Sequence, residues 1–171
     1  DDCSTDGTVT LLECFAERAP FPVRLQINET TLGTVKNFEK TILRCQGDII
    51  ALCDQDDIWL PAKLARLEAV LDEKPDVGLV FSDAALIDEQ SKPLGRRLWG
   101  FTFPASVRKR FQRGEQEHVL AIANVVTGAT MAFRTYFRDL FCPIPKLTIT
   151  VHDGWIAQIV AAFAKLDIVG E

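Results

Sequence analysis

One stretch decides how this chain folds: Asp48-Ile49-Ile50-Ala51-Leu52-Cys53-Asp54-Gln55-Asp56-Asp57-Ile58-Trp59-Leu60-Pro61. Its apolar run, residues 49–53, predicts a buried strand that is covered on both faces. Asp54, Asp56 and Asp57 follow at the carboxyl end of that strand, and Pro61 suits the first position of a helix. A divalent cation that bridges to substrate phosphates would satisfy these carboxylates. The alternative is a solvated acidic turn that caps the next helix.

Helical and extended patterns alternate on both sides of this stretch. Helices are expected over 7–18, with Thr5 or Asp6 as the cap, over 34–45, and from Pro61 to Pro75; strands are expected over 23–27, 49–53 and 77–81. This order predicts an α/β sheet of parallel strands joined by helices. Ligands of such sheets bind outside the carboxyl ends of the strands. The acidic cluster and the opening Asp1-Asp2 loop both fall on that edge.

The second half of the chain is less regular. Residues 88–113 are broken by glycine and proline, and they carry most of the basic residues of this part: Arg96, Arg97, Arg108, Lys109, Arg110 and Arg113. A solvated helix and loop is one interpretation, and contact with an anionic acceptor, a diphosphate leaving group or a membrane surface is the other. Beyond them we expect a strand within 121–133, where Gly128 allows close backbone approach, a short helix over 134–141, an apolar helix through Ala164 and a strand over 166–169.

Composition narrows the class of protein. The 171 residues fit one domain, and the net charge of −5 argues against general nucleic-acid binding. We see no apolar run of transmembrane length and no signal peptide. Five cysteines without a CxxC pair favour reduced thiols in a cytoplasmic protein. The chain opens on Asp1 with no apolar strand before it, so we expect a fragment that lacks its first strand.

Three elements taken together resemble a known family. They are the opening Asp-Asp-x-Ser-x-Asp-Gly-Thr loop, the strand that ends in Asp54-x-Asp56-Asp57, and the acid Asp153 at the head of a late helix. This order is similar to family 2 glycosyltransferases of the GT-A fold. The local motifs look like the rhamnosyltransferase-like branch: Asn28-Glu29-x-x-Leu32-Gly33, Lys36-Asn37-Phe38, Asp54 to Pro61, Thr127-Gly128-Ala129-Thr130-Met131-Ala132-Phe133 and His152-Asp153-x-Trp155.

The resemblance implies a Rossmann-like α/β fold with a mostly parallel sheet and helices on both faces. Residues 1–171 would form a single GT-A domain, truncated at the N-terminus and before the usual C-terminal tail. The implied enzyme moves a sugar, with inversion, from a UDP- or dTDP-linked donor to the hydroxyl of a saccharide or lipid-linked saccharide. Its product would be a bacterial surface polysaccharide, and the enzyme would work in the cytoplasm, with peripheral contact at the inner face of the membrane.

The resemblance also implies a role for each matching residue. Asp2 would contact the nucleotide base, Asp54 would lie near the donor ribose and sugar, and Asp56 would hold Mg²⁺ or Mn²⁺ on the donor diphosphate. Asp153 would be the general base on the acceptor hydroxyl, a role typically worth about 10²–10⁴-fold in rate. Gln55, Asp57 and His152 complete the expected substrate-binding set.

Each assignment has a plainer alternative. Asp153 could cap a helix that starts at Gly154, and His152, Trp59 and Trp155 could be packing residues. Asp1 and Asp6 could only shape their loop, and nothing in the sequence decides whether Asp83 lines the donor site.

Three other classes of protein remain to be weighed. An EF-hand fits badly, because Trp59 and Ala65 stand where that loop needs Gly and Glu. A haloacid dehalogenase-type phosphatase would place Ser4 at the nucleophile position, where a carboxylate is required. A non-catalytic nucleotide-sugar-binding module of the same fold stays open.

Overall fold

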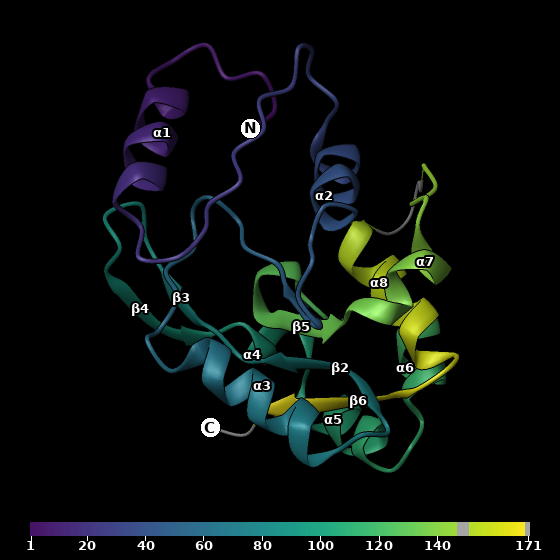
Figure 1. Ribbon diagram of the computed structural model, residues 1–171. Helices are drawn as coiled ribbons and strands as arrows, with labels where there is room; N and C mark the ends of the chain where they lie inside the picture. The colour runs from purple at the N-terminus through teal and green to yellow at the C-terminus, as the bar shows by residue number, and fades with distance from the viewer. Residues whose placement is uncertain (147–150, 170–171) are drawn as a thin grey trace. The chain divides into compact units, whose positions relative to one another are not determined.

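The computed structural model describes residues 1–146 and 151–169. The chain divides into two compact units, Asp1–Arg44 and Cys45–Glu171. Figure 1 labels most of the helices and strands of both units. Each unit has its own internal contacts and is considered by itself.

The first unit contains two helices, α1 (Thr8–Arg18) and α2 (Thr34–Ile42). The helix predicted over 34–45 therefore ends three residues early, at Ile42. The strand predicted over 23–27 is wrong, because no strand is assigned there. Residues of this segment and just after it form hydrogen bonds with Asp1 instead. The Asp1 ammonium donates to the Gln26 carbonyl at 2.7 Å, and the Asn28 amide donates to the Asp1 carbonyl at 3.0 Å.

The second unit is built on a four-stranded sheet in the order β1 (Ile49–Ala51), β5 (Met131–Arg134), β2 (Val77–Ser82) and β6 (Lys165–Val169). Strand β5 runs antiparallel to both β1 and β2, whereas β6 is parallel to β2. Three of the four strands therefore share one direction, with β5 reversed between two of them (Figure 1). The predicted α/β class is confirmed, and the reversal of β5 is the feature that the sequence pattern did not indicate.

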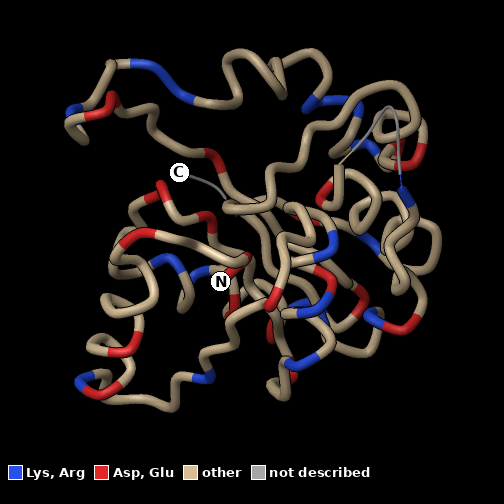
Figure 2. Tube along the Cα trace, turned by 90° about the horizontal axis from the view of Figure 1, so that it is seen from above, with Lys and Arg blue, Asp and Glu red and all other residues tan. Residues whose placement is uncertain are grey.

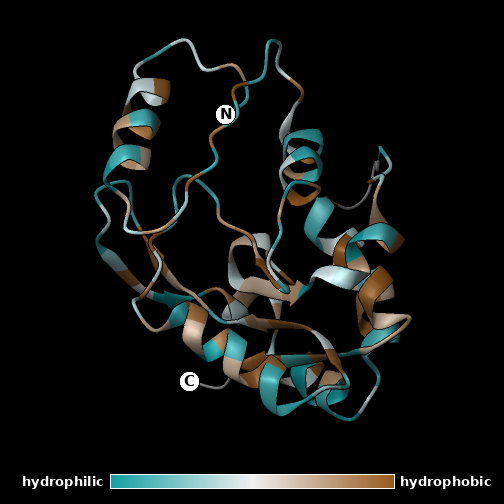
Figure 3. Ribbon diagram, viewed as in Figure 1, coloured by the Kyte–Doolittle hydropathy of each residue, from teal (hydrophilic) through white to brown (hydrophobic). Residues whose placement is uncertain are grey.

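Both faces of β2 are covered by side chains from helices. On one face, Val80 packs with Leu67 and Leu71 of α3 (Lys63–Glu73). On the other face, the ring of Phe81 lies 5.8 Å from Trp99 and 5.6 Å from each of Phe103 and Phe111, measured between centroids. Adjacent residues of a strand point to opposite faces, which explains how one short strand serves two cores. Figure 3 colours most of β2 on the hydrophobic side of the scale.

The aromatic side of the core comes from the region in which the sequence showed little pattern. This region holds a hairpin, β3 (Ala85–Ile87) and β4 (Pro93–Arg97), followed by α4 (Trp99–Thr102), α5 (Ala105–Gln112) and α6 (Gln116–Ile122). The sequence analysis missed the hairpin, because Pro93 and Gly95 are weak strand formers and β4 is exposed throughout.

Asp83 ties this hairpin to the end of β2. Its Oδ1 accepts from the Trp99 amide at 2.9 Å, and its Oδ2 accepts from Arg97 Nε at 2.6 Å. Burial alone would raise the pKa of Asp83, but these donors outweigh it and lower the pKa. Asp83 is thus occupied in holding the fold, a role that the sequence left undecided.

The remaining elements of the second unit differ from their predicted bounds. The 3₁₀ turn Gly128–Thr130 leads into β5, so the strand predicted within 121–133 begins only at Met131. The helix predicted over 134–141 is a 3₁₀ turn, Thr135–Phe137, followed by α7 (Arg138–Phe141). Helix α8 (His152–Ala161) ends three residues before Ala164.

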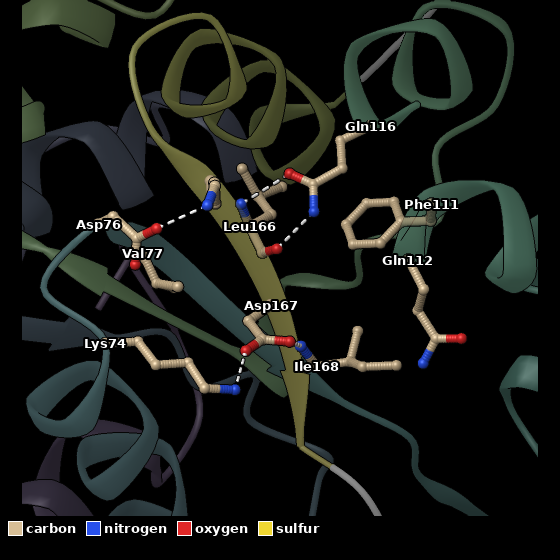
Figure 4. A pocket seen from close by; sticks show the side chains of 10 residues that line it. Lys74, Asp76, Val77, Phe111, Gln112, Gln116, Leu166, Asp167 and Ile168 are labelled. Carbon is tan, nitrogen blue, oxygen red and sulfur yellow. Dashed lines mark hydrogen bonds and ion pairs between the residues drawn. The ribbon is translucent and has the colours of Figure 1, made fainter. Parts of the chain in front are cut away.

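One side chain forms hydrogen bonds with the backbone at the free edge of β6. Gln116 Nε2 donates to the Leu166 carbonyl at 2.6 Å, and Gln116 Oε1 accepts from the Leu166 amide at 2.8 Å (Figure 4). This pair of bonds imitates a neighbouring strand at Leu166 and occupies backbone groups that could otherwise pair with another chain.

Gln116 also borders a hollow of about 240 Å³ beside β6 (Figure 4). Two ion pairs cross its rim, Lys74 with Asp167 at 2.6 Å and Lys165 with Asp76 at 2.8 Å. The carboxylate partners raise the pKa of both lysines. None of the site residues predicted from the sequence lines this hollow.

The distribution of charged residues and the hydropathy of the helices complete the description of the fold. Acidic and basic residues both occur along much of the trace in Figure 2. Among residues 1–146 and 151–169, no helix combines the length and the apolar character that crossing a membrane requires.

We expect Gly78→Ala to destabilise the second unit. A Cβ at position 78 would lie 2.6 Å from a ring carbon of Phe137, 2.7 Å from Val160 and 2.8 Å from Ala164. Overpacking of this kind costs about 1–3 kcal/mol. Chemical denaturation of both proteins measures the difference. Gly100→Ala is the matched control, because a Cβ there meets nothing within 4 Å. Equal unfolding free energies for Gly78→Ala and wild type would contradict the packing described above.

Candidate functional site

The acidic loop, residues 54–60, leaves the carboxyl end of β1 as predicted. Asp54 is half-buried, whereas Asp56 and Asp57 are exposed. Burial raises the pKa of Asp54, and the charge of Asp57 raises it further. Weaker electrostatic contributions come from His152, which lowers this pKa, and from Asp153, which raises it. Asp54, the predicted donor-side acid, and Asp153, the predicted base, therefore lie close enough for their charges to interact.

The acidic loop does not cap the following helix. Helix α3 begins at Lys63 after the N-cap residue Ala62, and no side chain makes a capping hydrogen bond there. Pro61 lies in the turn before the helix, two residues earlier than a first-position proline would. The interpretation of these acids as a helix cap is therefore wrong, and their carboxylates are available for another role.

The direction of β5 explains why the acidic loop and the turn that holds Asp153 lie at the same edge of the sheet. In an antiparallel pair, the beginning of one strand lies beside the end of its neighbour. Ala51 at the end of β1 pairs with Ala132, and the Leu52 amide donates to the Met131 carbonyl at 3.4 Å. The turn that precedes β5, residues 127–130, is thereby brought to the carboxyl end of β1. A parallel strand would have brought residues after Arg134 to this edge instead.

Asp153 is held by that turn. It is 8% exposed, and its Oδ2 accepts a hydrogen bond from the Gly128 amide at 3.0 Å. Its Oδ1 accepts from Asn124 Nδ2 at 3.0 Å and from the Gly154 amide at 2.6 Å. Val151 is the N-cap of α8 and makes no side-chain capping bond, so the interpretation of Asp153 as a helix cap is wrong. A carboxylate offers about four acceptor positions, and three of these are used.

Gly128 packs closely against the first residues of α8. A Cβ there would lie 3.2 Å from His152 Nε2 and 3.8 Å from Asp153 Oδ2. The close backbone approach predicted for Gly128 is thus confirmed. Asn124 was missed by sequence reasoning, because a lone asparagine in a loop carries no signal of its partner.

His152 is a buried residue of the site, 6% exposed. Burial lowers its pKa, while the charges of Asp153 and Asp54 act in the opposite direction and are outweighed. The lowered pKa favours the neutral imidazole at pH 7, and His152 is the first residue of α8, directly before Asp153.

Asp2 organises the first unit. Its Oδ1 accepts from Asn28 Nδ2 at 2.9 Å and from the Leu32 amide at 2.8 Å, and its Oδ2 accepts from the Gly33 amide at 2.8 Å. These bonds, that from Leu32 above all, lower the pKa of Asp2. Lys40 Nζ in turn donates to Asn28 Oδ1 at 2.7 Å. The loop before α2 is thus built around an ionised Asp2.

The donor chemistry of the acidic loop fits a hard divalent cation that arrives with a diphosphate. Within the described ranges, no three His, Cys, Asp or Glu side chains gather as a metal-binding group. Mg²⁺ is commonly held by only one or two carboxylates together with substrate phosphates. The exposed carboxylates of Asp56 and Asp57 supply oxygen ligands of that kind.

Comparison with known proteins shows what the chain is similar to. It is 30% identical over 79 residues to the abequosyltransferase RfbV of Salmonella typhimurium, covering 46% of this chain and 24% of that protein. It is 30% identical over 97 residues to the putative teichuronic acid biosynthesis glycosyltransferase TuaG of Bacillus subtilis, covering 56% and 37%. Each match thus spans well under half of the relative's length.

Structural comparison adds the fold. The crystal structure of S. aureus TarS 1-349 matches with a TM-score of 0.67 and 17% identity, over 100% of this chain and 47% of that one. At this identity the likeness establishes the GT-A fold alone.

A family model provides the classification. The model described as glycosyl transferase family 2 matches residues 1–141, which is most of the chain. The chain therefore belongs to glycosyl transferase family 2.

Proposed function

We propose that this chain carries the donor site and the catalytic base of an inverting glycosyltransferase. The enzyme transfers a sugar from a nucleotide diphosphate to an acceptor hydroxyl. One observation carries the proposal: Asp153 is buried and held by three hydrogen-bond donors, within electrostatic reach of Asp54 at the end of β1.

Asp153 is the proposed general base. The Gly128 and Asn124 donors fix the orientation of its carboxylate, and one acceptor position stays open for the proton of a substrate hydroxyl. As that proton moves to Asp153, the acceptor oxygen bonds to the anomeric carbon and the bond from this carbon to the diphosphate breaks. One displacement of this kind inverts the configuration. A positioned carboxylate contributes about 10²–10⁴-fold to such a step.

The acidic loop is the proposed donor-binding element. Asp56 would hold Mg²⁺ or Mn²⁺, and Asp54, Gln55 and Asp57 would lie along the sugar and ribose. A bound cation offsets the negative charge that develops on the departing diphosphate. In the first unit, Asp2 would accept from the nucleotide base, because among the described residues its Oδ2 accepts from the Gly33 amide alone.

The substrate classes follow from the family and the motifs. We propose a rhamnosyltransferase-like enzyme with a UDP- or dTDP-linked donor and a saccharide or lipid-linked saccharide acceptor. The printed name of one relative, for teichuronic acid biosynthesis, supports a product in a bacterial surface polysaccharide. A cytoplasmic location with peripheral membrane contact agrees with that role.

We expect calorimetry to detect Mn²⁺-dependent binding of UDP, dTDP or GDP to the wild-type chain. Asp56→Ala should weaken this binding by more than about tenfold, since the cation supplies several kcal/mol of charge stabilisation. Asp153→Asn should leave it within about twofold, because the base is needed for transfer and not for nucleotide binding. Asp72→Ala, an exposed acid on α3, is the matched control.

Two results would contradict this proposal. Equal binding by Asp56→Ala and wild type would remove the acidic loop from the metal site. Binding of none of the three nucleotides would favour a chain that keeps the fold without the activity.

We also expect the affinity for nucleotide to fall at acid pH because Asp54 becomes protonated; this fall is the acid limb of the binding profile. Because the pKa of Asp54 is raised, its carboxylate takes a proton at a higher pH than an ordinary aspartate does. Below that point affinity should fall by up to about tenfold per pH unit. Titration of wild type and Asp54→Asn across the acid range tests this.

The variant should bind weakly and lack that limb. Its stability should change in the opposite sense: a raised pKa means that the folded state disfavours the charged form, so Asp54→Asn should melt slightly higher than wild type at neutral pH. An acid limb that is identical in both proteins would contradict the assignment.

A further inference from the structure

Lys63 joins the acidic loop to the turn that holds Asp153. It is the first residue of α3, and its Nζ donates a hydrogen bond to the Ala129 carbonyl, 66 positions along the chain. The same Nζ lies 3.9 Å from the centroid of the Trp59 ring. One ammonium group thus contacts the end of the acidic loop and the turn before β5.

The contact with the Lys63 ammonium accounts for the position of the Trp59 ring. Within the part of the chain that the structure describes, the buried indole N–H of Trp59 has no hydrogen-bond acceptor. The face of the ring contacts the Lys63 ammonium, a contact that does not replace the missing acceptor of the N–H; a cation over an aromatic face is worth more when both groups are desolvated.

The surroundings of Lys63 are chemically distinctive. The side chain is half-buried, and burial lowers its pKa, while Cys53, Asp57 and Asp54 act in the opposite direction. All three of these groups belong to the strand end and the loop. The ammonium is thus the positive charge that faces the acidic loop from α3.

We propose that Lys63 is a positioning residue, which fixes the acidic loop against the Thr127–Ala129 turn so that the donor-side acids and Asp153 keep one geometry. Its Ala129 contact lies one residue from Gly128, whose amide holds Asp153 at 3.0 Å. A shift of the loop would therefore move it relative to the base. The catalytic meaning of this contact rests on the proposed glycosyltransferase function, but the mechanical link does not.

Amide hydrogen exchange tests the link without any ligand. In Lys63→Met, which keeps the aliphatic stem and loses the charge, peptides covering 54–60 and 127–130 should exchange about tenfold faster, the loss expected for one charged hydrogen bond. Peptides from β2 should be unchanged. Lys63→Arg should restore exchange close to that of wild type, because guanidinium can also donate to Ala129 and stack on Trp59.

Two further variants make the result decisive. Lys165→Met removes an exposed lysine that pairs with Asp76 and should leave both peptides unchanged. Trp59→Leu removes the ring contact and should accelerate the loop peptides, which keeps the test available if Lys63→Met does not fold. Unchanged exchange at 54–60 in Lys63→Met would overturn the proposal, as would faster exchange spread evenly over β2.

Binding of Mn²⁺ with UDP, dTDP or GDP to the same proteins then measures the consequence. The nucleotide that wild type binds should bind about tenfold more weakly to Lys63→Met and within about threefold to Lys63→Arg. Equal binding by wild type and Lys63→Met, with a mobilised loop, would overturn the positioning role. If wild type binds none of the three, the proposed function fails, and hydrogen exchange still decides whether Lys63 joins the loop to the turn.

Discussion

The hydrogen bond from the Gly128 amide to the Asp153 carboxylate is the contact on which the second unit's candidate site depends. It joins the turn before β5 to the first turn of α8, two segments 25 positions apart. A Cβ at position 128 would lie 3.2 Å from His152 Nε2, so the imidazole would have to shift slightly to accept a larger residue. The bond also provides part of the compensation that a buried carboxylate requires, since burying a charge without donors is costly. A residue held in this way is oriented before any substrate arrives.

The topology of the sheet brings the acidic loop to the same place. Because β5 runs against β1, its beginning meets the end of β1, and the turn that holds Asp153 lies beside the loop that begins at Asp54. Lys63 then links the two segments from α3. A donor-binding loop and a base on separate segments must keep a fixed separation for a single displacement, and geometry of this kind contributes strongly to rate. We propose that strand direction and one ammonium group together provide it.

Parts of this arrangement could be predicted from residues alone. The runs 49–53 and 77–81 are continuously apolar, and a strand forms in each. Strand β2 is buried over 77–81 as predicted, whereas β1 ends at Ala51 and only Ile50 of its three residues is fully buried. The acids after β1 and Asp153 were recognised through motif order. The alternation over 23–27 looked equally regular, yet no strand is assigned there. Alternating side chains predict an extended segment but do not supply a partner strand.

Other parts could not be predicted, for definite physical reasons. Periodicity carries no information on strand direction, so the reversal of β5 and the position of its preceding turn were hidden. Strand β4 of the hairpin at 85–97 is exposed and contains Pro93 and Gly95, which weaken the strand signal. The partners of Asp83 and Asp153 are backbone amides, Arg97 and Asn124, whose side chains or peptide groups are common in any loop. Such contacts become visible only when the chain is folded.

The central claim is that the acidic loop and Asp153 form one donor site around a cation bound with a nucleotide diphosphate. Paramagnetic broadening of amide NMR signals by Mn²⁺, added to the chain with the nucleotide it binds, tests this most directly. The account predicts that signals of residues 54–57, Gly128 and Asp153 broaden first and that this broadening needs the nucleotide. Broadening centred elsewhere, for instance on the acids beside β6, or an equal effect without nucleotide, would contradict it.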